Sequence, residues 1–504
     1  MVDEIRTIPP KLTKTEWNAL LDHALIKPTT YIIYKVGTEY RAVNGMTGKV
    51  DYYGTDATTV IQSAIDALPT SGGKILMKEG KYVLGTKIVI NKNSVELAGT
   101  NKGGDLFFTN DGTYHGQSNK MATLIIADGI DGIHVGETTF VQGIAINNLF
   151  ISGTDSDEAL GDDVYSIGAG IKLENVNTVS IENVQVRHKE YGLYTKPTEP
   201  FAWNHVIDVL TINNLYLCYN LYGWISEGFV SNVRVHNLFG YINQRGVLHV
   251  TPQYNWLIDG VWSNADCRNP LTDYDCSIFV STARDVTLRN IVVAGAYGTT
   301  LSSKPLIRID VNVSGTPESY RGRVLLEDIV LFETQQDAIR IAGTGHIFIH
   351  NIHAGSTGTE GFYGGSGTIT EKIVNNLDPS TAYVEVIGGY VKSALANKAD
   401  WFAGVKVIKS LINWSITDKV EPVTFNDHIK LESVKKLCSK NFAGTAIKDL
   451  IYLDSNDRTQ LMMHGGDISD ISNSPDATLS GTPKVITLYI AGTPYYFKVY
   501  QTKT

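Results

Sequence analysis

The stretch LTINNLYL (residues 210–217) carries the pattern that decides the fold: apolar residues at alternate positions on both sides of Asn214. The same pattern, with Asn, Asp or Gly as the central marker, returns at 144–151, 179–186, 233–240, 256–263, 286–293, 324–331, 347–354 and 384–391. Alternation of period two predicts a short strand with one buried face on each side of the marker. Asn, Asp and Gly tolerate the left-handed conformation of a sharp bend.

Consecutive markers are separated by 23 residues at the closest, as between Asn214 and Asn237, and larger separations indicate inserted loops. A third strand follows most markers, for example YGWIS (222–226). Strands flanking a bend and repeated in this way are typical of solenoid coils. We therefore expect an all-β fold: a right-handed single-stranded parallel β-helix over residues 51–395.

The two ends of the chain differ from this repeat. Residues 1–50 contain a helical pattern at 13–26 and then short strands, which predicts an N-terminal helix and hairpin region for attachment. Residues 56–68 have an apolar helical stripe and predict a helix that caps the solenoid. Beyond residue 395 the repeat fades, so residues 396–504 are expected to form a β-rich C-terminal module for oligomerisation or capping.

The region 54–84 resembles the opening of the pectate-lyase-like β-helix superfamily, which includes polysaccharide lyases, family-28-type glycosidases and phage tailspikes. The resemblance rests on the predicted cap helix, Gly72-Gly73, a short strand, and Gly80 before Tyr82; Lys78 stands where the family usually has proline. It implies a parallel β-helix, and with the coils it extends over about residues 50–395.

The family's catalytic motifs do not transfer. Asp162-Asp163, Gly345-His346 and Arg340-Ile341-Ala342 resemble glycosidase motifs singly, but their order and spacing do not correspond. Among members of the superfamily, the chain is most similar in organisation to phage or virus tailspikes. That resemblance implies a homotrimer that binds, and often cleaves, a cell-surface polysaccharide.

Charge and hydropathy restrict the partners. With 43 Lys and Arg against 52 Asp and Glu, the net charge of −9 has the wrong sign for general binding to nucleic acid or an anionic membrane. No apolar run approaches the ~18 residues of a membrane span, so no membrane insertion is expected. The first residues, MVDEIRTIPPKLTKTEW, lack the apolar segment of a signal peptide. We expect a virion or extracellular surface location that is reached without a cleavable signal, for instance in a virus particle released by lysis; a cytoplasmic location is the alternative.

The third strand of each coil predicts an outward row that includes Lys172, His249, Arg308 and Arg340. Stacked coils lie about 4.8 Å apart, so arginines in consecutive coils would be neighbours. The catalytic candidates are these two arginines and three nearby carboxylates: Arg308, Arg340, Asp310, Glu333 and Asp337. One interpretation is an ion-pair ladder between coils. The other is a subsite for an acidic sugar with carboxylates for acid–base chemistry, in either hydrolysis or β-elimination.

Aromatic side chains gather in the middle of the repeat, beside a long polar loop. The substrate-binding candidates are Trp203, Tyr222, Trp224, His249, Tyr254, Trp256, Trp262, Arg268 and Asp273. Exposed aromatic faces stack on sugar rings, which favours a carbohydrate platform. The alternatives are that these rings fill the interior or a trimer interface, and that the loop is ordinary surface.

No cofactor motif and no metal-ligand spacing is present. The acidic loop at 153–163 has oxygen ligands of the kind that Ca²⁺ prefers, but a solvated loop explains it better. The leading hypothesis is a tailspike-like protein that binds a cell-surface polysaccharide and depolymerises it as a hydrolase or lyase. A non-catalytic structural or adhesive fibre protein is the alternative, and a free secreted lyase is a third interpretation.

Overall fold

The computed structural model describes residues 29–100, 121–153, 165–198 and 207–414, apart from gaps at 229, 251–252, 265, 268–274, 282, 296–302, 312–321, 356–368 and 392–397, together with short strands between 436 and 503. The chain divides into two units, Met1–Asp418 and Lys419–Thr504. The helix expected at 13–26 and the acidic loop at 154–163 lie outside the described residues.

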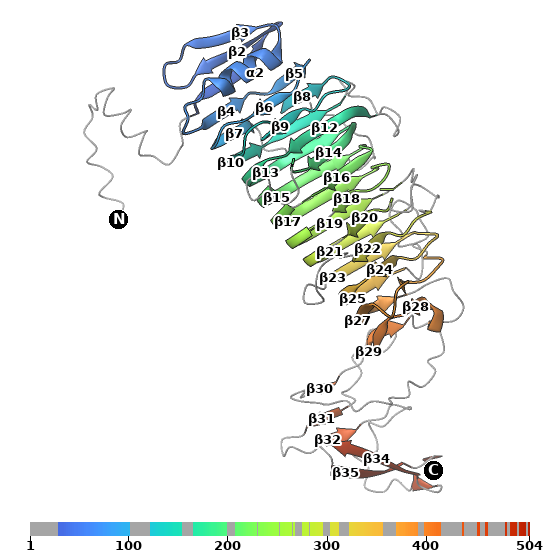
Figure 1. Ribbon diagram of the computed structural model, residues 1–504. Helices are drawn as coiled ribbons and strands as arrows, with labels where there is room; N and C mark the ends of the chain where they lie inside the picture. Colours follow the sequence, from blue (N-terminus) through green and yellow to red (C-terminus); the bar gives the residue numbers. More distant parts are fainter. Residues whose placement is uncertain are drawn as a thin grey trace, which may run out of the picture. The chain divides into compact units, whose positions relative to one another are not determined.

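The first unit begins with an antiparallel meander of β1 (Tyr31–Val36), β2 (Glu39–Asn44) and β3 (Val50–Gly54). Helix α2 (Ala57–Asp66) follows at the same end of the solenoid (Figure 1). The Asp56 side chain caps α2 by accepting from the backbone N–H of Thr58 and Thr59, at 3.0 and 3.3 Å. The apolar face of α2 is buried. The role of α2 as a cap of the solenoid stays a prediction.

The strands of the solenoid lie in two sheets, and a coil passes from one sheet to the other. After the meander, the first sheet consists of β4 (Gly73–Met77), β5 (Gly80–Leu84), β7 (Val95–Gly99), β8 (Ala122–Ile126), β10 (Val141–Asn147), β11 (Leu149–Ser152), β13 (Val176–Arg187), β15 (Ile207–Cys218), β17 (Val230–Tyr241), β19 (Gln253–Asn264), β21 (Ala283–Ala294), β23 (Gly322–Phe332), β25 (Gly345–Ala354), β27 (Ala382–Val391) and β29 (Lys406–Trp414). The second sheet consists of β6 (Ile88–Ile90), β9 (Ile133–Val135), β12 (Ser166–Leu173), β14 (Lys189–Thr195), β16 (Tyr222–Ser226), β18 (Leu248–Val250), β20 (Ile278–Ser281), β22 (Ile307–Val311), β24 (Ile339–Gly343), β26 (Val374–Asn376) and β28 (Phe402–Ala403).

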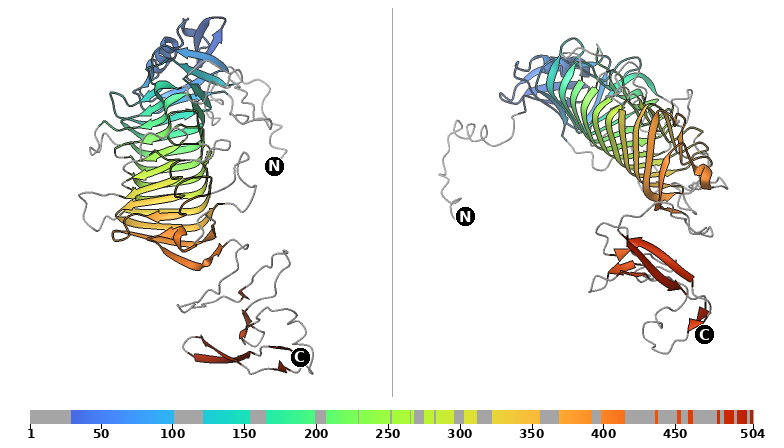
Figure 2. Two further views of the ribbon diagram at one scale, coloured as in Figure 1. Left: turned by 90° about the vertical axis from the view of Figure 1, so that its right-hand side faces the viewer. Right: turned by 60° about the horizontal axis from the view of Figure 1, so that its bottom comes forward.

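Successive coils pair in parallel and stack along the axis of the unit (Figure 2). Equivalent side chains therefore form rows. Ile212, Val235 and Ile258 are register partners in consecutive coils, and each is at most 2% exposed. Such interior rows form one continuous apolar core, and the expected parallel β-helix is confirmed.

The repeat markers form the predicted bends. The markers of all nine copies have positive φ, from 53° at Asn183 to 115° at Gly389. Four of them also form a ladder: the Nδ2 of Asn237 donates to the Oδ1 of Asn214 at 2.9 Å, Asn214 donates to Asn183 at 2.9 Å, and Asn183 donates to Asn148 at 3.1 Å. Asn suits the marker position for two reasons: it adopts the left-handed conformation, and its amide hydrogen-bonds to markers of neighbouring coils.

Replacing Asn214 with alanine should lower the free energy of unfolding by about 2–3 kcal/mol, since it adds left-handed strain and removes both ladder hydrogen bonds. Asn214→Gly should cost about 1–2 kcal/mol, because glycine loses the hydrogen bonds but fits the bend. Urea unfolding midpoints of the three proteins provide the measurement. Equal midpoints for the two variants would rule out backbone strain at this bend.

Parallel pairing continues beyond residue 395 into β28 and β29, and the short 3-10 helix η4 (Lys398–Trp401) precedes β28. β29 pairs with β27 but shifts register where β27 has its marker glycine, Gly389. Its sequence KVIKSLINW has no Asn, Asp or Gly at that point, which is why the repeat is hard to see there.

The second unit is described only as strands, which pair antiparallel within it. They are β30 (Lys436–Leu437), β31 (Ile451–Leu453), β32 (Thr459–Leu461), β33 (Leu479–Ser480), β34 (Lys484–Ile490), β35 (Thr493–Val499) and β36 (Thr502–Lys503). β34 and β35 form an antiparallel pair, from Lys484 opposite Val499 to Ile490 opposite Thr493. In the described part of the chain, no helix has the length and apolarity to cross a membrane.

Candidate functional site

The second sheet places one outer side chain per coil in a single row, here called the outer row. From the N-terminal coil onward it contains Val89, His134, Lys172, Tyr194, Ile225, His249, Phe279, Arg308, Arg340 and Asn375. The four basic residues expected to face outward together do share this row. They do not form an unbroken basic line, because Tyr194, Ile225 and Phe279 lie between them.

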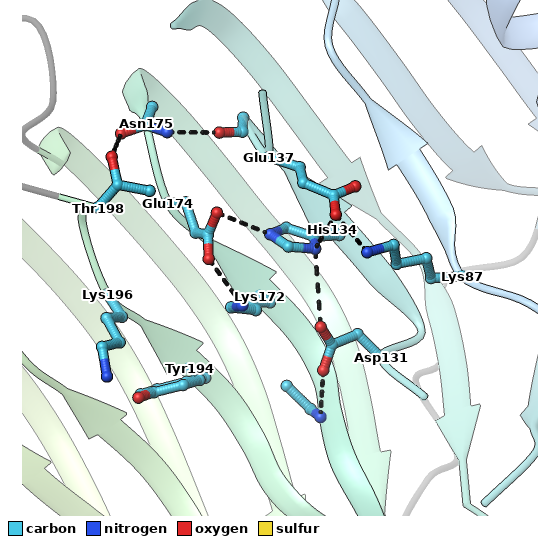
Figure 3. Close-up of polar contacts among 12 residues, drawn as sticks. Lys87, Asp131, His134, Glu137, Lys172, Glu174, Asn175, Tyr194, Lys196 and Thr198 are labelled. Atoms are coloured by element: carbon cyan, nitrogen blue, oxygen red, sulfur yellow. Dashed lines mark hydrogen bonds and ion pairs between the residues drawn. The ribbon is translucent and has the colours of Figure 1, made fainter. Parts of the chain in front are cut away.

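Around His134 the row carries a cluster of opposite charges (Figure 3). The Nδ1 of His134 lies 3.6 Å from an Asp131 oxygen and 4.0 Å from a Glu137 oxygen, and Nε2 lies 3.2 Å from Glu174. These are ion-pair distances, and neither ring nitrogen has a hydrogen bond of good geometry to a described group. Three carboxylates thus surround one imidazole, in a unit called here the His134 cluster.

Two lysines hold the glutamates of the cluster. Lys172 Nζ lies 2.7 Å from Glu174, and Lys87 pairs with Glu137. The hydrogen bond from Lys87 lowers the pKa of Glu137, so that carboxyl group stays ionised. Burial lowers the pKa of His134, and the charge of Lys172 lowers it further. The three carboxylates act in the opposite direction, but the net shift is downward. His134 is therefore neutral at pH 7 and can accept a proton.

Asp131 is held by backbone rather than by a lysine in ion-pair contact. Its Oδ1 accepts from the N–H of Ala169 at 2.9 Å. The preceding carbonyl, of Ile130, accepts from the Nζ of buried Lys189 at 3.0 Å, and the same Nζ donates to the Ile167 carbonyl at 2.7 Å. Burial lowers the pKa of Lys189 to about 8. The loop that carries Asp131 is consequently tied to β12 from two sides.

The cluster has the geometry for acid–base chemistry on a glycosidic bond. The oxygens of Asp131 and Glu137 both lie within 4.0 Å of one nitrogen. They are therefore at most about 8 Å apart, which is below the ~9.5 Å upper limit for the two carboxyl groups of glycosidases.

Next along the outer row, tyrosines form a stacked group. Tyr191 stacks on Tyr194 with ring centroids 4.7 Å apart and on Tyr222 at 6.0 Å. Arg245 donates to the Tyr222 hydroxyl at 3.0 Å, and Tyr194 donates to Glu227 at 3.0 Å. Burial raises the pKa of each of these tyrosines, so all of them stay protonated. We call Tyr191, Tyr194 and Tyr222 the tyrosine platform.

The arginines of the predicted catalytic set are register partners in β22 and β24, and each is paired with a carboxylate of its own coil. Arg308 contacts both oxygens of Asp310, the closest at 2.8 Å, and Arg340 Nε donates to Asp337 at 3.0 Å. The two arginines are thus paired within their own coils, which differs from the ladder between coils that one interpretation of the sequence expected. Glu333 is fully buried at a bend with φ 70°, so it does not face a substrate as predicted.

No protein-family model and no curated protein sequence matches the chain. Solved structures with similar folds include ORF18 of Geobacillus virus E2, at 13% identity and a TM-score of 0.42, where the match covers 72% of this chain and 59% of that one. DFA-IIIase from Arthrobacter chlorophenolicus has 13% identity and a TM-score of 0.43, covering 73% and 96%. The mannuronan C-5 epimerase A-module from Azotobacter vinelandii has 14% identity and a TM-score of 0.33, covering 69% and 91%.

The chain is a parallel β-helix protein. The parallel pairing of successive coils confirms the fold that the resemblance in the sequence implies. The solved structures have identities of 10–14% and TM-scores below 0.5, so no activity passes from them to this chain. The match spans about three fifths of the phage protein's length. Assignment of chemistry to this chain therefore depends on its own residues.

Two predicted sugar-stacking residues lie inside the solenoid. Trp224 and Trp256 are 0% and 1% exposed and stack on each other with centroids 5.2 Å apart. They fill the core, so their assignment to a carbohydrate platform is wrong. Trp262 is 42% exposed but lies on the first sheet, away from the outer row.

His249 is 9% exposed, and its Nε2 donates to the carbonyls of Arg245 and Cys276, each at 3.1 Å. It therefore supports the sheet rather than facing solvent. Tyr222 is half-buried in the tyrosine platform. Tyr254 lies in β19, but its side chain is outside the described set, as are Trp203, Arg268 and Asp273 entirely. Cys267 and Cys276 are free, buried thiols.

Sequence reasoning found Lys172 in the His134 cluster but missed the rest. The segment DGIHVGE (131–137) has a local signal, because a histidine between two apolar residues of a short strand faces outward, and its acidic neighbours lie three residues away on either side. Glu174 and Lys87 come from adjacent coils of unequal length. Only the coil register brings them to His134.

Proposed function

We propose that the protein binds a polysaccharide along the outer row and hydrolyses a glycosidic bond at the His134 cluster. The observation that carries the proposal is the gathering of Asp131, Glu137 and Glu174 around one buried, neutral imidazole. Hydrolysis requires a proton donor and a carboxylate that activates water or attacks the sugar. Glu137, held ionised by Lys87, takes the second role. Asp131, the other carboxyl group beside the Nδ1 of His134, is assigned the first.

Electrostatics favour hydrolysis over β-elimination at this cluster. Elimination acts on a uronate, whose carboxylate must be neutralised by a cation. Here three carboxylates face two lysines, and both lysines are already paired. A uronate placed at the cleavage point would be repelled, so a neutral sugar fits it better.

The tyrosine platform supports the binding part of the proposal. Lys172 and Tyr194 are register partners in adjacent coils, so the platform begins about 5 Å from the cluster. Hydrogen bonds fix its hydroxyl groups, which leaves half-buried ring faces for the apolar face of a sugar. A glycan lying along the solenoid axis would contact the platform and the cluster together.

We extend the proposal to a tailspike-like role, in which a homotrimer on a virus particle acts on a cell-surface polysaccharide. It is supported by the long solenoid joined to a separate antiparallel C-terminal unit. Sedimentation equilibrium of the full chain tests it, and a mass of three chains is the expected result. A monomer would contradict the trimer and favour the secreted-enzyme interpretation.

The catalytic proposal is tested by incubating the full chain with capsular polysaccharide, lipopolysaccharide and uronate polymers and measuring new reducing ends. On any substrate that is cleaved, Glu137→Gln should lower the rate about 100-fold, because one carboxylate of the pair is lost. Glu96→Gln is the matched control. Glu96 is also paired with a lysine and has almost the same side-chain exposure, 27% against 28%, but lies on the first sheet. It should change the rate less than twofold.

An unsaturated uronate product, detected by its ultraviolet absorbance, would show that the reaction is β-elimination and would contradict the proposed hydrolysis. Full activity in Glu137→Gln would remove the His134 cluster from catalysis. Binding without cleavage would support the second candidate, a non-catalytic adhesive fibre protein. That candidate is favoured by one observation: Glu137, Glu174, Asp310 and Asp337 all form ion pairs on the second sheet.

A further inference from the structure

The first sheet carries a second group of aromatic and charged side chains, near the opposite end of the solenoid from the His134 cluster. Arg323, His346 and Tyr383 are register partners in β23, β25 and β27. In the row beside them, Phe348, Glu385 and Lys406 are partners in β25, β27 and β29. We call these six residues the Tyr383 patch. It lies on strands β23, β25, β27 and β29, which run from yellow to orange in Figure 1.

Three rings of the patch form one continuous surface. The Tyr383 ring centroid lies 5.8 Å from that of His346 and 6.3 Å from that of Phe348. Tyr383 is 41% exposed, which is unusual for a large aromatic side chain. This exposure leaves part of the Tyr383 ring open for contact.

Hydrogen bonds fix the direction of the Tyr383 ring. Its hydroxyl donates to Glu385, and Lys406 Nζ donates to the same hydroxyl at 3.3 Å and pairs with Glu385 at 3.2 Å. The hydrogen bond from Tyr383 lowers the pKa of Glu385, and the bond from Lys406 lowers it further. A ring that is already immobilised loses little side-chain entropy when a ligand stacks on it.

The charges at the edges of the patch are positive and accessible. Lys406 is 59% exposed. Arg323 is exposed, and its guanidinium lies 6.0 Å from the centre of the Phe348 ring. Within the described part of the chain, no carboxylate lies within ion-pair distance of Arg323. A guanidinium that lies beside a ring, and that has no described carboxylate within ion-pair distance, is suited to a carboxylate or phosphate of a ligand.

We infer that the Tyr383 patch is a second carbohydrate-binding site, which takes an anionic oligosaccharide. One sugar ring stacks on Tyr383, and a carboxylate or phosphate group of the neighbouring sugar pairs with Arg323. The two residues are two coils apart, or about 10 Å, which matches the length of a disaccharide. This site goes beyond the proposed function, because it lies on the other sheet and needs no cleavage. Linked to binding at the outer row, it would increase avidity for a long glycan.

Affinity electrophoresis of the full chain in gels containing polygalacturonate tests the inference, with dextran gels as the neutral comparison. Polygalacturonate should retard the protein more strongly than dextran, and added salt should weaken the effect. Tyr383→Ala and Arg323→Ala should each weaken retardation by polygalacturonate at least fivefold. The control variants are Tyr53→Ala and Arg41→Ala, exposed residues of the N-terminal meander, and each should stay within twofold of the wild type.

Lack of retardation in polygalacturonate, or unchanged retardation in both patch variants, would overturn the inference. Repeating the series in the Glu137→Gln background separates it from the proposed function. If no glycan is cleaved but retardation still depends on Tyr383 and Arg323, the patch stands and the hydrolase proposal fails. If cleavage occurs and retardation is independent of both residues, the hydrolase proposal stands and the patch fails.

Discussion

Replacing Trp224 with alanine should lower the free energy of unfolding by about 3–5 kcal/mol, the range for loss of a fully buried aromatic side chain. Trp224 is 0% exposed and stacks on Trp256 with centroids 5.2 Å apart. Its Nε1–H also donates to Thr195 Oγ1 at 3.1 Å, so the alanine variant leaves a cavity and removes one of the two hydrogen bonds of that buried hydroxyl, which still donates to the Ile225 carbonyl.

Urea unfolding followed by circular dichroism measures the change, and Trp262→Ala is the matched control. Trp262 is 42% exposed on the first sheet, so its loss should cost about 1 kcal/mol or less. Equal destabilisation by the two variants would contradict the interior placement of Trp224. Unchanged retardation of the Trp224→Ala protein in a glycan gel is also expected, because a buried ring does not meet a sugar.

The positions of all three tryptophans were readable from the strand patterns of the sequence. Trp256 opens the copy WLIDGVWS, at a position that is apolar in every other copy, and Trp262 falls on an alternate, outward position. In YGWIS, alternation places Trp224 in line with Leu248 of the next coil, an interior residue. Grouping the aromatics by closeness along the chain concealed this, because successive side chains of a strand face opposite sides.

The bends and rows could be predicted because they depend on local rules: alternation of period two and the left-handed preference of Asn, Asp and Gly. The His134 cluster could not, because it depends on which residue of one coil lies beside which residue of the next. Coils that contain loops of unequal length give no fixed spacing from Lys87 to His134 to Lys172. The ion pairs are also hard to predict from the sequence, because a charged side chain can pair within its strand or between coils. Arg308, for example, pairs with Asp310 of its own strand.

Asn220, Asn243 and Asp266 follow one another at a constant spacing of 23 residues, and they form a buried ladder of two amides that ends in a carboxylate. Asn220, Asn243 and Asp266 are all at most 1% exposed. The backbone N–H and the Nδ2 of Asn220 both donate to the Oδ1 of Asn243, at 3.1 Å. The same two groups of Asn243 donate to the Oδ1 of Asp266, at 2.8 Å, and Ser263 Oγ donates to its Oδ2 at 2.6 Å.

Replacing Asp266 with asparagine should stabilise the protein at pH 8 by up to about 4 kcal/mol. Burial raises the pKa of Asp266 from 3.8 to about 7, against the hydrogen bonds that lower it. A raised pKa means that the folded state favours the protonated carboxyl. Stability from this group is fully present below pH 4 and is lost as the pH rises to about 7. The shift of about 3 pKa units corresponds to about 4 kcal/mol.

Asparagine should fit this site because it continues the ladder. Its Oδ1 can accept from Asn243 as Asn243 accepts from Asn220, and its Nδ2 can donate to the Ser263 hydroxyl. Thermal melts of both proteins between pH 4 and pH 9 provide the measurement. The difference in melting temperature, variant minus wild type, should be near zero at pH 4, rise up to about pH 7 and then level off. A difference that does not change with pH, or a variant less stable at pH 8, would show that the three donors keep Asp266 ionised at little cost.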